Sequence, residues 1–366
     1  MVYRAIGIMS GSSLDGLDIV FTELNENAGK WNYEILNAVC YPYSKEWIEK
    51  LKTAINLSAL DYQLLHSQYG HYIGNEVNRF IEENGLQYKV ALIASHGHTT
   101  FHMPAKKMTA QLGDGAAIAA ITGLPVVTDL RAMDIALAGQ GAPIVPIGEK
   151  LLLDDYDYFL NLGGIANISA TKTARRIAFD ICPANRVLNM LAIEVGLEFD
   201  AGGQLASTGT INEGLLNELN DLDYYSQPYP KSLANDFGTD IVYPIINKAS
   251  LKTEDTLRTY VEHIAIQIKK AISSVGELRL LTTDSRLLAT GGGALNTFLI
   301  ERIKNHLEAT NVSVVIPDEN LIQYKEALIM ALIGVLRWRE EYNVLSSVTG
   351  AARDSIGGAL WNGQEA

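Results

Sequence analysis

The chain begins with two apolar segments joined by a turn of glycine, serine and aspartate. Residues 3–9 are mostly apolar, residues 10–16 read SGSSLDG, and residues 17–21 are again mostly apolar. This pattern predicts a β-hairpin. Small turn residues let a ligand approach the backbone, whose N–H groups can bind phosphate oxygens, while the carboxylates Asp15 and Asp18 can hold Mg²⁺. An ordinary turn with a solvent-facing aspartate has the same pattern, so this segment alone leaves both interpretations open.

Two further glycine turns occur far along the chain. Gly163 and Gly164 separate two apolar segments, and Gly291, Gly292 and Gly293 follow a third segment and precede a helical pattern. A strand that ends in glycines before a helix is typical of nucleotide sites, although each turn alone is also explained as a tight turn. Three such turns together favour a nucleotide-binding protein.

Composition narrows the class of protein. The chain has 366 residues, 48% of them hydrophobic, which is enough for two packed domains. Its net charge of −13, with no basic run, argues against nucleic-acid binding. Cys40 and Cys182 are too few for a disulfide framework or a zinc site and fit a reducing compartment. No signal-peptide pattern and no apolar run of roughly 20 residues is found, so we expect a cytoplasmic protein without a membrane segment.

Strand and helix patterns alternate along the chain, which predicts an α/β fold. Asp114 and Gly123 are expected to begin and end a short helix. The Gly/Pro-rich segment 138–146 is a candidate domain boundary, and residues 200–240 are expected to form long loops. Apolar residues recur with a helical period in three longer segments: 61–84, 257–275 and 325–338.

Asp180 is the best candidate for a catalytic residue, because the pattern places it at the end of a strand just before a helix. A carboxylate there can accept a proton while the helix terminus faces an anion. An N-cap or turn aspartate would have the same position, so the sequence leaves that alternative open.

Other polar residues are less specific. His96, His98 and His102 lie close together in sequence, but no Cys or carboxylate falls within their run, so binding of substrate hydroxyls, or no role, is favoured over a metal site. Arg131 either pairs with Asp134 or binds substrate. Glu326, expected at a helix start, either complements the helix dipole or accepts a hydrogen bond from a sugar hydroxyl.

Taken together, the motifs of this chain resemble those of the anhydro-N-acetylmuramic acid kinases, a branch of the sugar kinase/Hsp70/actin ATPase superfamily. The resemblance covers nearly the whole chain. It is carried by eight segments: 7–18 (GIMSGSSLDGLD), 95–99 (SHGHT), 111–114 (QLGD), 129–136 (DLRAMDIA), 139–146 (GQGAPIVP), 161–167 (NLGGIAN), 291–296 (GGGALN) and 347–351 (SVTGA).

The resemblance implies a two-domain actin-like ATPase fold, of the ribonuclease H-like type, with a nucleotide cleft between the domains. The domains are expected at residues 1–130 with 345–366, and at 131–344. The implied activity is that of a kinase in cell-wall (peptidoglycan) recycling. Using ATP and Mg²⁺, it opens 1,6-anhydro-N-acetylmuramic acid with water and phosphorylates O6 to give N-acetylmuramic acid 6-phosphate. A homodimer is also compatible with the resemblance.

By the same resemblance, Asp180 is the base that deprotonates the attacking water, and Asp15 or Asp18 lies near Mg²⁺. His96, Arg131 and Glu326 fall on segments that contact the sugar. The remaining residues are expected to bind ATP: Gly11, Ser12, Ser13, Leu14, Asp15, Gly16, Leu17 and Asp18 with Gly163 and Gly164 at the phosphates, and Gly291, Gly292, Gly293 and Asn296 at the adenosine.

The chain departs from the family pattern next to Asp180. The family usually reads Asp-Thr-Gly-Pro-Gly-Asn where this chain has DICPAN at 180–185. This difference leaves open an actin-like ATPase or binding protein that has lost sugar phosphorylation. A dinucleotide-binding oxidoreductase is a second alternative, but the chain has no G-x-G-x-x-G after its first strand.

Overall fold

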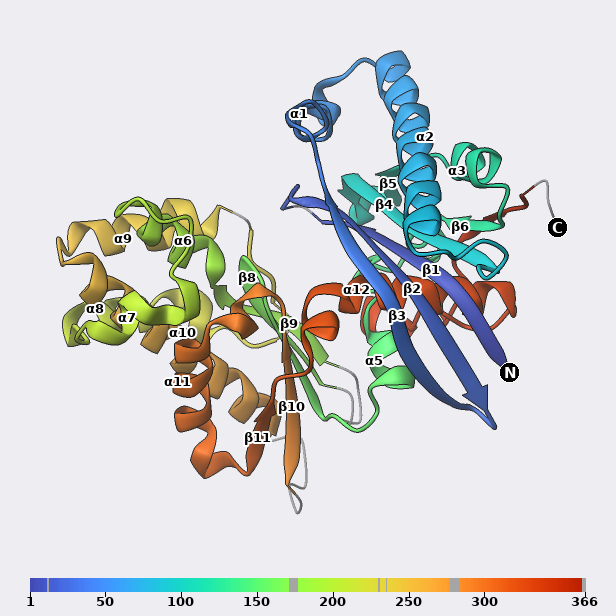
Figure 1. The fold of residues 1–366 in the computed structure, drawn as a ribbon. Helices are drawn as coiled ribbons and strands as arrows, with labels where there is room; N and C mark the ends of the chain where they lie inside the picture. Colours follow the sequence, from blue (N-terminus) through green and yellow to red (C-terminus); the bar gives the residue numbers. More distant parts are fainter. Residues whose placement is uncertain (12, 171–176, 230, 235, 277–283, 364–366) are drawn as a thin grey trace. The chain divides into compact units, whose positions relative to one another are not determined.

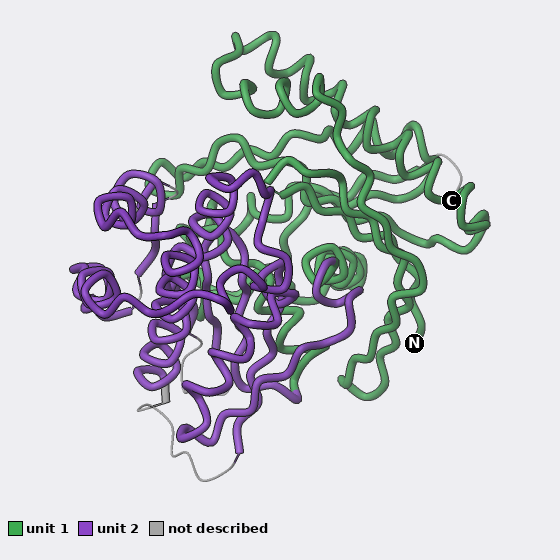
Figure 2. Tube along the Cα trace, turned by 60° about the vertical axis from the view of Figure 1, so that its left-hand side comes forward, with its two compact units in different colours: residues 1–154, 324–366 green, residues 155–323 purple. Residues whose placement is uncertain are grey.

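The protein folds into two compact units. The computed structural model describes residues 1–11, 13–170, 177–229, 231–234, 236–276 and 284–363. Unit 1 comprises Met1–Asp154 and Tyr324–Ala366, and unit 2 comprises Asp155–Gln323 (Figure 2). Each unit contains one β-sheet with helices packed against it, so the expected α/β class is confirmed.

The limits of the units differ from the expected domain boundaries. Residues 131–154 and 324–344 belong to unit 1, although the sequence analysis assigns them to the second domain. The Gly/Pro-rich segment is part of unit 1 rather than a linker. The N–H of Gly141 donates to the buried carboxylate of Asp134 at 2.7 Å, and the N–H of Gln140 donates to the carbonyl of Thr349 at 2.8 Å. Glycine and proline suit a tightly turned interior segment as well as a linker, and composition cannot separate the two.

The sheet of unit 1 has the strand order β12-β6-β4-β1-β2-β3, with β5 paired to β4. β1, β2 and β3 are antiparallel to one another, whereas β4 is parallel to β1 and β6 is parallel to β4. The strands are β1 (Val2–Ser10), β2 (Gly16–Asn27), β3 (Lys30–Pro42), β4 (Leu92–Met103), β5 (Met108–Leu112), β6 (Val126–Thr128) and β12 (Ala359–Trp361).

Helices cover both faces of this sheet (Figure 1). Ile6 and Ile8 of β1 are buried with the apolar side of α2, whereas a Cβ at Gly7, which points to the opposite face, would lie 1.9 Å from the carbonyl oxygen of Ala327 in α12. Only glycine fits there, and α12 therefore packs directly on the β1 backbone. The helices are α1 (Lys45–Thr53), α2 (Ala59–Glu83), α3 (Gly115–Thr122), α4 (Ala132–Ala136), α5 (Pro146–Leu152), α12 (Glu319–Trp338, mostly in unit 1) and α13 (Ser346–Thr349).

The sheet of unit 2 repeats this plan with the order β11-β10-β7-β8-β9. β7, β8 and β9 are antiparallel to one another. β10 is parallel to β7 and β11 is parallel to β10, as β4 is to β1 and β6 is to β4 in unit 1. The sequence shows no repeat that would reveal this duplication of topology. The strands are β7 (Tyr158–Leu162), β8 (Ile165–Ala170), β9 (Ile177–Pro183), β10 (Ser285–Thr290) and β11 (Val312–Val315).

The helices of unit 2 pack around α10 (Thr253–Gly276), whose side chains Leu257, Val261, Ile264 and Ile268 are completely buried. The three long helices expected from periodicity are confirmed as α2, α10 and α12, and Asp114 and Gly123 cap α3. The other helices of unit 2 are α6 (Asn185–Ile193), α7 (Gln204–Thr208), α8 (Glu213–Asn220), α9 (Tyr243–Lys248) and α11 (Thr297–Leu307).

The expectation of long loops over 200–240 is wrong. This region contains α7, α8 and three short helical turns. The carboxylate of Asp200 accepts the N–H groups of Leu205 and Ala206, and Asn212 caps α8 through the N–H of Leu215. Helices of five to eight residues are too short to show a periodic pattern, and their stability comes from such caps and from packing.

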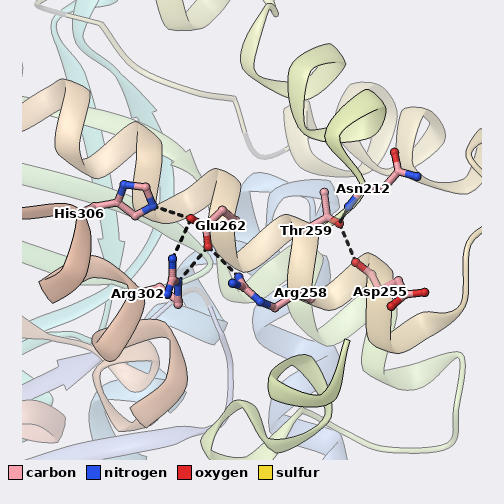
Figure 3. A network of polar contacts seen from close by, with 7 residues as sticks. All are labelled: Asn212, Asp255, Arg258, Thr259, Glu262, Arg302 and His306. Carbon is pink, nitrogen blue, oxygen red and sulfur yellow. Dashed lines mark hydrogen bonds and ion pairs between the residues drawn. The ribbon is translucent and has the colours of Figure 1, made fainter. Parts of the chain in front are cut away.

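A buried ionic network joins α10 to α11 (Figure 3). The Glu262 carboxylate accepts hydrogen bonds from Arg258 at 2.7 Å and from Arg302 at 2.9 and 3.1 Å, and its other contact is with Nε2 of His306 at 2.6 Å. Burial alone would raise the pKa of Glu262, but the three basic partners outweigh it and hold the pKa at about 2. Glu262 therefore stays ionised and fixes two helices to each other.

Candidate functional site

The turn between β1 and β2 contains the first set of candidate residues. Its backbone is tightly turned: Leu14 has a φ of 58°, and the Asp15 carboxylate accepts the Ser13 hydroxyl at 2.6 Å and the N–H of Gly16 at 3.1 Å. A Cβ at Gly16 would lie 2.6 Å from the carbonyl oxygen of Tyr41, so this position requires glycine. Ser12, also expected in this site, lies outside the described residues.

The side chains of Leu17 and Asp18, which follow this turn, point to opposite faces of the sheet. Leu17 is completely buried in the core of unit 1, so its side chain cannot contact a nucleotide. Asp18, the next residue along β2, points to the opposite face. It lies beside Cys40, its partner in register on β3, whose thiol hydrogen-bonds the carboxylate.

Asp18 is surrounded by negative charge. Burial raises its pKa to about 6, and the nearby carboxylates of Asp15 and Glu326 add to this, while the Cys40 hydrogen bond opposes it. Glu326 lies seven residues into α12, so the expectation that it stands at a helix start is wrong. A divalent cation would offset the repulsion within this group of carboxylates.

The carboxylates around the β1–β2 turn can be compared with the ligands that Mg²⁺ requires. Among the described residues, no three or more His, Cys, Asp or Glu side chains are grouped as a complete metal cage. Mg²⁺ usually takes only one or two protein carboxylates and completes its shell with water and phosphate oxygens. Asp15 and Asp18 match that smaller requirement.

His96 and Arg131 form a second group in unit 1. The Nε of Arg131 donates to Nε2 of His96 at 2.8 Å, and its Nη1 donates to the carbonyl of Gly141 at 2.6 Å. The other ring nitrogen of His96, Nδ1, lies 2.8 Å from the carbonyl of Gly97, which identifies it as the protonated nitrogen of a neutral ring. Burial, and then the charge of Arg131, lower the pKa of His96 to about 3.

Arg131 and Asp134, suggested above as a pair, are each fixed by other partners. Asp134 is completely buried and accepts the N–H of Gly141 at 2.7 Å and the hydroxyl of Thr349 at 2.6 Å. It therefore orders the backbone that carries the Gly141 carbonyl, and that carbonyl holds Arg131. Glu326 also acts electrostatically on Arg131, which links the two groups of unit 1.

The other two histidines have ordinary partners. His98 lies 3.1 Å from the hydroxyl of Ser10, and His102 lies 3.1 Å from the hydroxyl of Thr109. The described residues hold no three-ligand metal cluster that would include either of them.

In unit 2, Asp180 lies within β9, three residues before the strand ends at Pro183. The N-cap of α6 is Ala184, so the alternative interpretation of Asp180 as a helix cap is wrong. One oxygen of its carboxylate accepts the N–H of Leu233 at 2.9 Å. Burial raises the pKa of Asp180, and the bond from Leu233 opposes this only in part.

The backbone of Asp180 is also held in place. Its N–H donates to the carbonyl of Lys231 at 3.2 Å, and its carbonyl accepts the hydroxyl of Tyr224 at 2.7 Å. Tyr224, Lys231 and Leu233 thus contact this residue at three points. A carboxylate fixed in this way is pre-positioned to accept a proton.

The residues that depart from the family pattern lie in the core. Ile181, Cys182 and Ala184 are at most 2% exposed and belong to the hydrophobic cluster of unit 2. These three side chains therefore fill space in the core of unit 2.

The second and third glycine turns are brought together. The carbonyls of Gly163 and Gly164 accept the N–H groups of Asn185 and Ala184, at 3.0 and 2.8 Å. Gly291 has a φ of 80°, and a Cβ there would lie 2.5 Å from the Asn161 side chain. Close packing of the two turns therefore requires glycine.

A pocket of about 280 Å³ opens beside these turns. Gly292, Gly293 and Asn296, expected at the adenosine, line it, and Asn296 also caps α11 through the N–H of Leu299. No local sequence pattern marks the remaining lining residues as part of a site. They are Asn185, Leu188, Asn189, Phe199, Asp200, Gly202 and Leu295. Of these, Asn185 and Leu295 lie in motif segments named above (180–185 and 291–296), and Asp200 and Gly202 lie in the region expected to form loops.

The chain is similar to known proteins over nearly its whole length. The family described as "Anhydro-N-acetylmuramic acid kinase" matches residues 3–363. The anhydro-N-acetylmuramic acid kinase of Francisella tularensis subsp. novicida is 33% identical, over 97% of this chain and 97% of its own length. The protein of the same name from a Sulfurovum species is 32% identical, over 98% and 99%.

Among solved structures, the activator of the 2-hydroxyisocaproyl-CoA dehydratase from Clostridium difficile, with bound ADPNP, aligns with a TM-score of 0.45. It is 13% identical and covers 92% of this chain and 96% of its own.

Proposed function

This chain belongs to the anhydro-N-acetylmuramic acid kinase family, and from that membership we propose how its own residues carry out the family's reaction. The enzyme opens the 1,6-anhydro bond of its sugar with water and transfers the γ-phosphate of ATP to O6. The products are N-acetylmuramic acid 6-phosphate and ADP. The match over residues 3–363 carries this assignment.

Asp180 is the proposed general base. Its carboxylate takes a proton from water as the water oxygen bonds to C1 of the sugar. The bond from C1 to O6 breaks, and O6 keeps its electron pair and attacks the γ-phosphorus, from which ADP departs. Support comes from the burial of Asp180 and its fixed hydrogen bonds, because a desolvated carboxylate with a raised pKa is a stronger base than one in water.

Arg131, His96 and Glu326 are the proposed sugar ligands. A guanidinium has five N–H donors, and the bonds to His96 and Gly141 use two of them. Neutral His96 orients the guanidinium rather than donating a proton, since its pKa of about 3 keeps the ring unprotonated near neutral pH.

ATP is expected to bind through the glycine turns. The proposed phosphate contacts are the backbone of residues 11–18 and of Gly163 and Gly164, and the proposed adenosine site is the pocket beside Gly292, Gly293 and Asn296. Asp15 and Asp18 would hold Mg²⁺, which neutralises phosphate charge when bound. The crowding of carboxylates around Asp18 supports this role.

The proposed location is the cytoplasm, because ATP is a substrate and both cysteines are free thiols. No helix in the described ranges has the length and apolar character needed to cross a membrane. A homodimer is the proposed assembly on family resemblance alone, and light scattering of the purified protein would test it.

The reaction is tested by product analysis in water enriched in oxygen-18. With ATP and 1,6-anhydro-N-acetylmuramic acid, mass spectrometry should find label at C1 of the phosphorylated sugar and none in its phosphate. Label in free phosphate without sugar phosphorylation would identify a plain ATPase and contradict the proposal.

A further inference from the structure

Unit 2 contains a second and larger pocket that the proposed reaction does not use. It has a volume of about 600 Å³ and lies against the C-terminal half of α10 and the outer strand β9. This volume is within the range of roughly 300–1,000 Å³ typical of small-molecule sites. Its lining consists of Phe179, Ile181, Tyr225, Ser226, Gln227, Pro228, Tyr229, Lys231, Gln267, Lys270, Ala271 and Ser274.

The charged side chains that line this pocket are all positive. Among the described residues that form the pocket are two lysines, Lys231 and Lys270, and no aspartate or glutamate. The two ammonium groups act on each other, because Lys270 contributes to a lowered pKa of Lys231, after the larger effect of burial. Lys231 is further held over the ring of Tyr224, 4.5 Å from its centroid, and donates to the Tyr224 carbonyl at 3.0 Å. An anion would relieve this repulsion.

The rest of the lining suits a hydroxylated ring. Ser226, Gln227 and Gln267 add hydroxyl and amide groups to the lining. The Ser226 hydroxyl donates to the carbonyl of Asp223 at 2.8 Å and Nε2 of Gln267 donates to the side chain of Asn220 at 2.7 Å, so their oxygens are oriented as acceptors for the hydroxyls of a ligand. Phe179 and Tyr229 stack on each other, with ring centroids 5.4 Å apart, and form an apolar wall. A molecule with a phosphate group, several hydroxyls and one apolar face satisfies all three features.

The pocket is structurally connected to Asp180. Phe179 and Ile181, the two neighbours of Asp180 on β9, both line the pocket. Residues 225–229 and 231 line the pocket. Beside them, Tyr224 and Leu233 donate hydrogen bonds to Asp180, and the carbonyl of Lys231 accepts the Asp180 N–H. A ligand that fixes this segment therefore also fixes the proposed base.

We propose that this pocket binds a sugar monophosphate as a regulatory ligand, with Lys231 and Lys270 at the phosphate, and that its occupancy alters the reactivity of Asp180. Binding is independent of the proposed function, and only the regulatory part rests on it. The product of the proposed reaction belongs to this chemical class, so feedback by product is one form that the regulation takes.

Binding is tested by calorimetric titration of the full chain with glucose 6-phosphate. The parent should bind, and the double variant Lys231→Gln/Lys270→Gln should bind at least about tenfold more weakly, because two charge-assisted contacts are lost. Lys269→Gln is the matched control, since Lys269 is an exposed neighbour on α10 that does not line the pocket. It should bind as the parent does.

A second variant keeps the charges and fills the space. Ser274→Phe places a ring in the pocket and should also weaken binding, while circular dichroism reports whether each variant is folded. Absence of binding to the parent, equal affinity in the parent and the double variant, or the same loss in Lys269→Gln would each overturn the proposal.

The regulatory part is read from initial rates of sugar phosphorylation. Glucose 6-phosphate should change the rate of the parent and leave the rate of the double variant unchanged. Binding without any change in rate would overturn the regulatory part. A chain that binds glucose 6-phosphate but phosphorylates no sugar would instead contradict the proposed function and leave the binding site standing.

Discussion

Asp18 in unit 1 and Asp180 in unit 2 are both partly buried aspartates on β-strands, but neighbouring charges act on the pKa of Asp18 alone. Asp18 has the carboxylates of Asp15 and Glu326 nearby, and these add to the effect of burial on its pKa. For Asp180, burial raises the pKa and the bond from the Leu233 N–H lowers it, with no second carboxylate among the causes.

This difference separates two uses of a desolvated carboxylate. Crowded negative charge is relieved by a divalent cation, so Asp18 is suited to hold Mg²⁺. A single desolvated carboxylate is relieved by a proton, so Asp180 is suited to be a base. Glu262 is a third kind of desolvated carboxylate. Its basic partners stabilise the negative charge, so it is suited neither to hold a cation nor to accept a proton.

The largest effect should follow from Asp180→Asn. The amide keeps the shape of the side chain but cannot take a proton, and we expect sugar phosphorylation to fall by at least about 10²–10⁴-fold. ATP affinity should be unchanged, since the proposed nucleotide contacts are elsewhere. Stopped assays of sugar phosphate, with equilibrium binding of ATP, measure both quantities.

The matched control for this variant is Asp221→Asn, which removes one negative charge from an exposed position of unit 2. It should behave as the parent does. If Asp180→Asn phosphorylates the sugar at nearly the parental rate, the base is another residue, and the comparison with Asp18 fails.

Asp18→Asn should affect the use of Mg·ATP rather than proton transfer. Loss of an outer-shell partner typically lowers metal affinity by about 10–100-fold, and we expect at least that increase in the Mg²⁺ concentration needed for half-maximal rate. Magnesium titrations at fixed ATP measure it.

The same variant should also raise the melting temperature measured without metal, because it removes a buried charge that Asp15 and Glu326 repel. Asp154→Asn, at an exposed position, controls for loss of charge. An unchanged requirement for Mg²⁺ would mean that the β1–β2 turn is only structural.

Glu262→Gln should lower stability without changing the chemistry. Removing one member of a buried ion pair costs about 3–5 kcal/mol, and we expect about 2–3 kcal/mol here because Arg302 and His306 remain partly exposed. Urea unfolding measures the loss, with Glu308→Gln, an exposed position, as control. A fall in kcat for the fully folded variant would show that this network also positions the site.

The pH dependence of stability has a definite sign for this group. The pKa of Glu262 in the folded protein, about 2, lies below its ordinary value of 4.5, so the folded state favours the ionised form. The stabilisation is complete above about pH 4.5 and is lost as the pH falls towards about 2. The difference in stability between the parent and Glu262→Gln should therefore shrink over that interval.

Parts of this structure could be predicted from sequence because their causes are local. Asp114 and Gly123 cap α3 through neighbouring backbone groups, and the long helices repeat their apolar residues over several turns. The glycine turns are predictable for the same reason, since each strand end and the glycines that follow it are adjacent in sequence.

The remaining features depend on contacts between distant segments. Arg131 is fixed by His96 and Gly141 rather than by nearby Asp134, and Glu326 approaches Asp18 only because α12 packs on β1. The position of Asp180 inside β9 depends on pairing with β8, and this pairing shifts register between Asp180 and Cys182. No local sequence pattern predicts these contacts between distant segments.

The smallest effect, a shift in a pH profile, tests the environment of Asp180 most directly. Burial raises its pKa above the ordinary 3.8, so protonation of the base begins at a higher pH than for an exposed aspartate. Only the ionised form accepts a proton from water. The rate at low substrate, kcat/KM, should therefore fall about tenfold per pH unit on the acid side, with its midpoint above 3.8. The residual rate of Asp180→Asn should show no such limb over the same range. A parental limb centred at or below 3.8 would mean that Asp180 is solvated in the working enzyme, and its contrast with Asp18 would then rest on neighbouring charge alone.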